Sequence, residues 1–319
     1  MALAFVFPGQ GSQITGMGRD LAAAFPAARE TFQEVDEALK QHLSRLMFEG
    51  PAEELTLTAN AQPALMAHSI AVLRVLEREG NLDLAARVAL VAGHSLGEYS
   101  ALTAARAFSV PTAARLLRLR GEAMQRATPP GTGAMAALLG AEPEQAQAIC
   151  AEAAADPETG GRAVLEVAND NGGGQVVVSG AKAAVERAVE AAKAAGIKRA
   201  MLLPVSAPFH CALMAPAADA MAEALEEAEI ARPAVPVVAN ASAAKATDPA
   251  EIRGLLVKQV TATVRWRECV ASMVSMGCDR FVELGAGRVL TGLMKRNAPD
   301  AQATAVGTPA DVEAVLKTL

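Results

Sequence analysis

Apolar residues cluster first at positions 3–7, a short run that predicts a buried strand and precedes the turn-forming segment Pro8-Gly9-Gln10-Gly11-Ser12. Apolar positions then recur with helical spacing over residues 62–79 and condense into a second strand-like run at 88–92. Helical spacing returns from residue 100 through 119. Strand and helix therefore alternate, which favours an α/β fold with a mainly parallel sheet covered by helices on both faces.

The pattern changes in the middle of the chain, where six elements are predicted in the order strand, helix, strand, strand, helix, strand. Their ranges are 133–139, 143–154, 163–169, 175–179, 181–195 and 199–205. This βαββαβ order is the split pattern of a ferredoxin-like module.

The domain organisation follows from what flanks this module. It comes after the linker-like stretch Thr128-Pro129-Pro130-Gly131, and strand-like runs at 235–240 and 280–284 indicate that the first domain resumes beyond it. We therefore predict a core domain formed by residues 1–128 and 206–319, with a smaller ferredoxin-like subdomain at 129–205 inserted into it.

Composition and charge restrict the class of protein. The chain has 319 residues, of which 52% are hydrophobic and 3% aromatic, and its formal net charge is -6. Aromatic residues for stacking on bases are scarce, and no basic stripe that would attract a phosphate backbone is visible. We therefore expect no nucleic-acid partner.

The cysteines and the amino terminus indicate the compartment. The four cysteines form no CxxC pair and no His/Cys cluster at metal-ligand spacing, so we expect reduced thiols, no disulfide and no bound metal. The amino terminus lacks a basic segment, and Pro8-Gly9 interrupts its apolar run, which argues against a signal peptide. Because no run of 18 apolar residues occurs, we expect no membrane span and a cytoplasmic enzyme.

Candidate chemistry begins at Gly93-His94-Ser95-Leu96-Gly97, between a predicted strand and a predicted helix. In a Gly-X-Ser-X-Gly elbow, the serine takes a strained conformation that exposes its hydroxyl, and the flanking glycines leave room for the turn. The free amides of the following helix can then face a reacting carbonyl. This context favours Ser95 as a nucleophile over the alternative of a plain Gly/Ser turn.

A base for Ser95 is sought among the four histidines. His94 is adjacent to the serine and is expected to support the elbow, His68 lies in an apolar helix as a core residue, and His42 lies on a polar helix face. His210 remains, in a proline-stiffened loop after a predicted strand, and its pKa suits proton transfer near neutral pH. No carboxylate to orient it is evident, so a backbone carbonyl is the alternative.

Two glutamates near the predicted strand ends are further candidates for a catalytic acid or base. Glu98 and Glu283 have no carboxylate partner at the spacing that paired acid/base chemistry needs. Both are expected to be structural.

Four ordered segments together resemble the malonyl-CoA:acyl-carrier-protein transacylase family, which is related to the acyltransferase domains of polyketide synthases. They are Phe7-Pro8-Gly9-Gln10-Gly11-Ser12-Gln13, Gly93-His94-Ser95-Leu96-Gly97-Glu98-Tyr99, Leu119-Arg120-Gly121 and Pro208-Phe209-His210-Cys211. The resemblance extends to the segment at 282–287. It implies an α/β-hydrolase-like core beside a ferredoxin-like subdomain.

The resemblance also implies roles for single residues. Ser95 would be acylated and His210 would be its base, with the main-chain carbonyl of Gln259 orienting the imidazole. The backbone amides of Gln10 and Leu96 would form the oxyanion hole.

Substrate selection is implied at two further positions. Arg120 would bind the free carboxylate of the malonyl group, which a guanidinium can hold with two parallel charge-assisted hydrogen bonds. The alternative is an arginine on a solvated helix face. Phe209 precedes the histidine where relatives carry Phe or Ser, and its ring favours malonyl over methylmalonyl because it occupies the space of an α-methyl group.

The resulting hypothesis is transfer of malonyl from malonyl-CoA to the phosphopantetheine thiol of acyl carrier protein in fatty-acid biosynthesis, without a cofactor. An acyltransferase of a polyketide pathway, a serine esterase or thioesterase, and a fold that has lost activity are the alternatives. Because carrier proteins are acidic, the basic residues Arg288, Lys295 and Arg296 are candidates for their docking.

Overall fold

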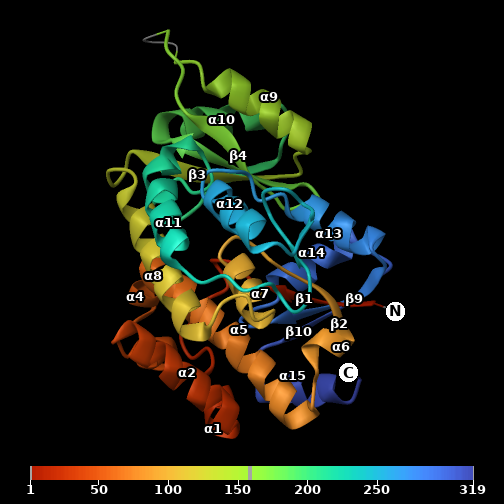
Figure 1. The fold of residues 1–319 in the computed structure, drawn as a ribbon. Helices are drawn as coiled ribbons and strands as arrows, with labels where there is room; N and C mark the ends of the chain where they lie inside the picture. Colours follow the sequence, from red (N-terminus) through yellow and green to blue (C-terminus); the bar gives the residue numbers. More distant parts are fainter. Residues whose placement is uncertain (1, 157–159, 319) are drawn as a thin grey trace.

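Two β-sheets organise the chain, and the computed structural model describes it over residues 2–156 and 160–318 (Figure 1). The larger sheet has the strand order β10-β9-β1-β2-β7-β8. Its strands are β1 (Ala2–Phe7), β2 (Val88–Gly93), β7 (Val237–Val238), β8 (Lys245–Ala246), β9 (Cys278–Leu284) and β10 (Gln302–Val306). From β10 to β7 neighbouring strands are parallel, and β8 is antiparallel to β7.

Both faces of this sheet are buried, as the alternation along β1 shows. Leu3, Phe5 and Phe7 belong to a core that includes helices α5, α7 and α8, whereas Ala4 and Val6 pack in a second core with α13 and α14. Successive side chains of a strand point to opposite faces, so an uninterrupted apolar strand requires a helix layer on each side.

The helices that surround the larger sheet come from both ends of the chain. They are α1 (Arg19–Ala24), α2 (Pro26–Leu39), α3 (Leu43–Glu49), α4 (Ala52–Thr56), α5 (Thr58–Gly80), α6 (Leu84–Arg87), α7 (Gly97–Ala104), α8 (Val110–Arg126), α11 (Ala215–Glu227), α12 (Pro249–Gln259), α13 (Trp266–Ser275), α14 (Val289–Asn297) and α15 (Pro309–Leu316), with a short 3-10 helix at Ala212–Met214.

The smaller sheet is antiparallel and has the order β4-β5-β3-β6. Its elements are β3 (Gly133–Leu139), α9 (Pro143–Ala153), β4 (Leu165–Asp170), β5 (Gln175–Ala181), α10 (Lys182–Ala194) and β6 (Arg199–Leu202). The two helices pack on the sheet around a core of their own. The predicted βαββαβ order and the mainly parallel larger sheet are confirmed, whereas the domain boundaries at 129 and 205 stay a prediction.

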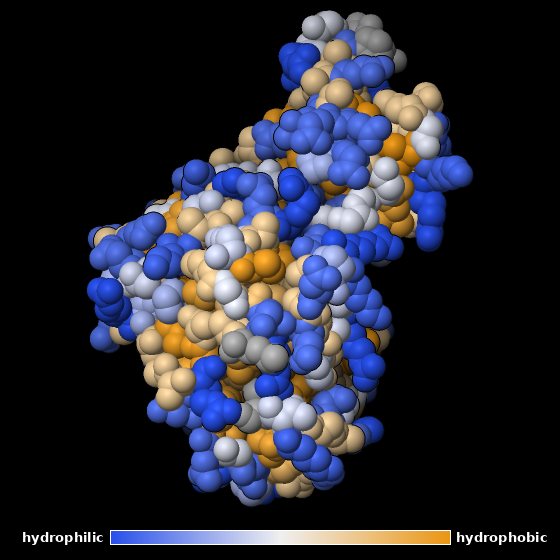
Figure 2. Space-filling view, turned by 90° about the vertical axis from the view of Figure 1, so that its right-hand side faces the viewer, coloured by the Kyte–Doolittle hydropathy of each residue, from blue (hydrophilic) through white to orange (hydrophobic). Residues whose placement is uncertain are grey.

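The smaller module stands above the larger one. Figure 1 shows α9, α10 and the smaller sheet at the top of the molecule, with the larger sheet and most of the helices below. In the side view of Figure 2 the upper part is the narrower one, and apolar residues are visible between polar ones on the broader lower part.

Several predicted element boundaries were wrong; the strand expected over 235–240, for example, contains only Val237–Val238. The helix expected through residues 100–119 is divided, because α7 ends at Ala104 and α8 begins at Val110. Between them Arg106 has a φ of 66°, and the Ser109 side chain accepts the Thr112 N–H as an N-cap. The strand expected to continue to residue 205 ends at Leu202, close to Pro204, which has no N–H to donate to a sheet.

Loops of three neighbouring parallel strands meet at the carboxyl edge of the larger sheet. Phe7 pairs with Gly93, so the loop after β1 and the turn after β2 lie side by side, and β7 on the other side of β2 leads to Asn240. Ligands bind at this edge in open α/β sheets. The polar residues of these loops are therefore placed together.

Gly93 is expected to tolerate no side chain. A Cβ at this position would lie 1.9 Å from the carbonyl carbon and oxygen of Gly97, where α7 turns back on β2. We expect Gly93→Ala to lower the free energy of unfolding by about 1–3 kcal/mol or more in urea denaturation. Gly254→Ala, at an exposed site in α12 with nothing within 4 Å of the new Cβ, is the control and should raise it by about 0.5–1 kcal/mol. A Gly93→Ala protein as stable as the wild type would contradict the expectation.

Candidate active site

Ser95 occupies a sharp turn between β2 and α7. Its φ is 54°, in the left-handed region that a non-glycine residue rarely adopts. The Ser95 N–H donates to Asn240 Oδ1 at 2.7 Å, and Asn240 Nδ2 donates to the Gly93 carbonyl at 2.7 Å. The side chain of Asn240 thus bridges both sides of the turn and holds the strained conformation.

His210 lies against the serine, as the sequence predicted. Its Nδ1 lies 2.9 Å from the Gln259 carbonyl oxygen, which can only accept a hydrogen bond, so Nδ1 carries the proton. Nε2 therefore has a free lone pair, and the Ser95 hydroxyl donates to it at 2.7 Å. Burial, reinforced by the Arg120 charge, lowers the pKa of His210 to about 3. The imidazole is neutral near pH 7, in the form that can accept the serine proton, although its pKa lies well below the near-neutral value expected from the sequence because the ring is buried.

Arg120 is a buried cation whose guanidinium points toward Ser95. Its side chain is 1% exposed. The guanidinium donates to Gln62 Oε1 at 2.8 Å, to Gln259 Oε1 at 2.9 Å and to Ser95 Oγ at 3.2 Å, and it lies 5.7 Å from the centre of the Tyr99 ring. Its position excludes the alternative of a solvated helix face.

The charge of Arg120 is in direct contact with no carboxylate in the described part of the chain. Among the described residues, Arg120 takes part in no ion pair and its Nε has no hydrogen-bond partner. Burial lowers the pKa of this guanidinium below its ordinary value. A buried cation without a counterion in direct contact attracts an anion of matching shape, and a carboxylate is such an anion.

A cavity of about 460 Å³ joins these groups. Residues of the larger module and of the smaller one line it, including Met135 of β3 and Asn169 of β4. Three further predicted site residues, Gln10, Leu96 and Phe209, line the cavity together with Ser95, His210 and Arg120. The buried Gln259 does not line it but accepts a hydrogen bond from Arg120. The structure thus brings the predicted site residues together, and their individual roles stay predictions.

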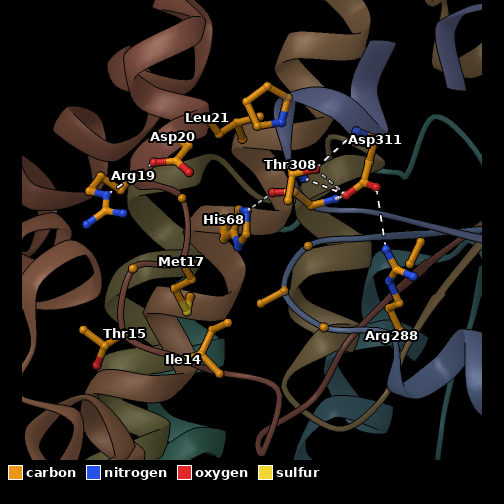
Figure 3. A pocket seen from close by; sticks show the side chains of 18 residues that line it. Ile14, Thr15, Met17, Arg19, Asp20, Leu21, His68, Arg288, Thr308 and Asp311 are labelled. Atoms are coloured by element: carbon orange, nitrogen blue, oxygen red, sulfur yellow. Dashed lines mark hydrogen bonds and ion pairs between the residues drawn. The ribbon is translucent and has the colours of Figure 1, made fainter. Parts of the chain in front are cut away.

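A second cavity, of about 350 Å³, is lined by residues 14–21, by His68 and by turns of the carboxyl-terminal part of the chain (Figure 3). His68 faces it between the segment 14–21 and the turn before α15, and its Nε2 lies 3.0 Å from the Gly307 carbonyl oxygen. Burial lowers the pKa of His68 to about 4. It is the core histidine that the sequence predicted. Arg288 lies at the rim, with Nη2 3.9 Å from Asp311 Oδ1.

The remaining predicted positions have structural contacts. His94 Nε2 lies 2.8 Å from Asn171 Oδ1 of the β4–β5 connection, so it links the elbow to the smaller module. Glu283 accepts the N–H groups of Leu290 and Thr291 at the start of α14. Arg296 is exposed and donates to the Gly173 carbonyl at 2.8 Å. The docking role of the basic cluster stays a prediction.

Sequence reasoning missed three contributions to the site. Gln62 supports Arg120 from α5, Asn240 supports the elbow, and the side chain of Gln259 contacts Arg120 in addition to its backbone contact with His210. Asn240 ends a predicted strand of the sheet, a position at which polar residues are often functional, and that signal was available. Gln62 carried no signal, because it lies within an apolar helix.

The described ranges hold no group of three or more His, Cys, Asp or Glu residues placed to bind a metal ion. Burial raises the pKa values of the four cysteine thiols, all of which are free: Cys150, Cys211, Cys269 and Cys278. In the same part of the chain no helix has the length and apolarity that a membrane span requires.

Comparisons with known proteins agree with this geometry. Residues 4–313 match the family described as Acyl transferase domain. The chain is 45% identical over 317 residues to a protein of Bacillus subtilis (strain 168) named Malonyl CoA-acyl carrier protein transacylase, and the match covers 99% of this chain and 97% of that protein.

Solved structures are also similar over the whole length. A crystal structure of acyl-carrier-protein-S-malonyltransferase from Bartonella henselae has a TM-score of 0.95 and 53% sequence identity, covering 99% of each chain. A malonyl-transacylase solved in complex with a type II PKS acyl-carrier protein has a TM-score of 0.94 and 45% identity, covering 100% of each chain.

The buried imidazole predicts a pH dependence of stability. Below about pH 6.5 the unfolded chain binds a proton at His210, whereas the folded chain does not until the pH approaches about 3. The free energy of unfolding should therefore fall with decreasing pH, and this one group contributes up to about 1.4 kcal/mol per pH unit. In urea denaturation between pH 6 and pH 4, His210→Gln should show a shallower decline than the wild type. Equal slopes would contradict the expectation.

Proposed function

The chain belongs to the acyl transferase family, and from this premise we propose that it moves the malonyl group of malonyl-CoA to the phosphopantetheine thiol of acyl carrier protein. The enzyme is then a malonyl-CoA:acyl-carrier-protein S-malonyltransferase with Ser95 as the acylated residue. The relatives' names support this reaction, and one feature of the cavity supports the choice of acyl group.

That feature is the short distance between the buried guanidinium and the nucleophile. Arg120 Nη2 lies 3.2 Å from Ser95 Oγ. In a malonyl group a single methylene separates the thioester carbonyl from the free carboxylate, so the two carbonyl carbons are only about 2.5 Å apart. A carboxylate held by Arg120 therefore leaves the thioester carbon next to Ser95 Oγ. A larger separation would suit a longer dicarboxylate instead.

In the first half-reaction, Ser95 gives its proton to His210 Nε2 while Oγ forms a bond to the thioester carbon. The backbone N–H groups of Gln10 and Leu96 hold the resulting oxyanion. When the carbon–sulfur bond breaks, CoA leaves as the thiol with the proton from His210. Malonyl-Ser95 remains, and the Gln259 carbonyl keeps the imidazole aligned throughout.

The second half-reaction runs the same steps in reverse with a different thiol. The phosphopantetheine thiol of the carrier protein transfers its proton to His210 and attacks the malonyl ester, and Ser95 Oγ recovers the proton as it leaves. Exchange of one thioester for another neither oxidises nor reduces the acyl group. The proposed reaction therefore uses no redox cofactor, and the imidazole performs the proton transfer without a metal.

Phe209 and the compartment complete the proposal. The Phe209 ring is 8% exposed and lines the cavity beside His210, where it takes space that an α-methyl group on the substrate would need. We propose a cytoplasmic location, which the buried free thiols support because they suit a reducing compartment.

Fatty-acid biosynthesis is the proposed pathway. A polyketide pathway is the second candidate, favoured by the likeness to a malonyl-transacylase solved with a type II PKS acyl-carrier protein. The serine esterase or thioesterase alternative gains no support from the buried guanidinium. The guanidinium selects the acyl group, whereas a hydrolase differs from a transferase in using water as the acceptor.

Incubation with malonyl-CoA alone should add one malonyl group to the protein. Intact-protein mass spectrometry followed by peptide mapping should locate it on Ser95, since no acceptor thiol is present to remove it. Ser95→Ala should remain unmodified. Subsequent addition of carrier protein bearing phosphopantetheine should discharge the enzyme faster than buffer does. If buffer discharges it equally fast, the protein is a hydrolase.

Removal of the guanidinium should change the preferred acyl group. We expect Arg120→Ala to lower kcat/KM for malonyl-CoA by about 100-fold or more, because two charge-assisted hydrogen bonds are lost, and to raise the relative activity with acetyl-CoA. Arg118→Ala on the same helix is the matched control, since Arg118 binds Asn60 and does not line the cavity. An unchanged ratio of malonyl to acetyl loading in Arg120→Ala would refute the carboxylate site.

A further inference from the structure

Glu98 is a buried carboxylate in the first turn of α7, three residues after Ser95, and the proposed mechanism does not use it. Its side chain is 2% exposed. Glu98 Oε2 accepts the backbone N–H of Asn240 at 2.9 Å and the side-chain N–H of Gln259 at 2.7 Å. Glu98 is thus linked to both residues that support Ser95 and His210.

The Gln259 side chain lies between this carboxylate and Arg120. A side-chain amide has an acceptor end and a donor end, and its neighbours decide which way each end points. Gln259 Nε2 faces acceptors, namely Glu98 Oε2 and the Ser95 carbonyl at 3.0 Å, whereas Oε1 faces the guanidinium of Arg120 at 2.9 Å. The Ser95 carbonyl only accepts, as does Glu98 in its ionised form, so the two oxygens together reject the flipped amide.

The arrangement also leaves the guanidinium available. In a direct ion pair, Glu98 would occupy the groups of Arg120 that bind a substrate carboxylate. With the amide between them, Glu98 and Arg120 form no ion pair within the described part of the chain, yet the charge of Arg120 still lowers the pKa of Glu98. Burial outweighs this attraction and raises that pKa to about 7.

We propose that Glu98 is a positioning residue for carboxylate recognition: it fixes the orientation of the Gln259 amide and thereby aims Arg120 at a carboxylate beside Ser95. This inference rests on the proposed malonyl transfer. It assigns to Glu98 a part in the choice of acyl group, distinct from any part in the chemistry at Ser95.

The test compares Glu98→Leu with Glu98→Gln. Leucine removes the acceptor at similar size, so kcat/KM for malonyl-CoA should fall about 10-fold more than kcat/KM for acetyl-CoA, mainly through KM. Glutamine retains a carbonyl oxygen that can accept both N–H groups, and it should restore most of the malonyl preference. A merely structural role would lower both loading rates together.

A double-mutant cycle with Arg120→Ala shows whether Glu98 acts through the guanidinium. In the Arg120→Ala background, Glu98→Leu should leave the malonyl to acetyl ratio unchanged. If Glu98→Leu lowers malonyl and acetyl loading equally in the wild-type background, or shifts the ratio equally in both backgrounds, the inference is overturned.

Two further measurements separate the possible failures. Gln259→Met removes the amide but retains the backbone carbonyl that holds His210, so it should reproduce the selective loss if Glu98→Leu does not fold. An unchanged malonyl to acetyl ratio in Gln259→Met would overturn the inference. A wild-type protein that loads no malonyl group on Ser95 would instead contradict the proposed function itself.

Discussion

Withdrawing a guanidinium from water is costly unless its charge and its N–H groups are compensated, and Arg120 is 1% exposed without an ion-pair partner among the described residues. Neutral oxygens provide the direct hydrogen bonds, and the charge of the buried Glu98 adds an electrostatic attraction. The uncharged side chains of Gln62, Gln259 and Ser95 each accept a hydrogen bond from Arg120. The Tyr99 ring lies beside the cation. These acceptors come from α5, α12 and the turn before α7. The hydrogen bonds of one buried cation therefore hold three separate elements together. Its positive charge can also attract the carboxylate of a substrate.

Backbone strain also occurs at this place. Ser95 and His210 have φ values of 54° and 58°, and a non-glycine residue in this region costs about 1–3 kcal/mol. The surrounding contacts compensate: Asn240 bridges the turn at Ser95, and the Gln259 carbonyl holds the imidazole of His210. The result is a serine hydroxyl already hydrogen-bonded to a neutral imidazole, so little rearrangement precedes the chemical step.

The smaller module takes part in the site as well as in the shape of the molecule. Met135 and Asn169 line the cavity from its sheet, and His94 joins the serine elbow to Asn171 across the modules. The smaller module therefore forms part of the wall of the cavity that contains Ser95.

The sequence by itself determined what depends on neighbouring residues: the strands before Pro8 and before the Ser95 elbow, and the βαββαβ order of the smaller module. It also predicted His210 as the base, by elimination among four histidines. Resemblance to a family added Arg120 and Gln259. Periodicity alone favoured a solvated arginine at position 120 and gave no indication of a role for Gln259. Only the tertiary structure decided the partners. Gln62 is 58 residues from Arg120, Glu98 is 142 from Asn240, and Asn240 is 145 from Ser95. Such contacts depend on how helices pack against a sheet, and no local pattern in a single sequence records that packing, so the support of the site became visible only in three dimensions.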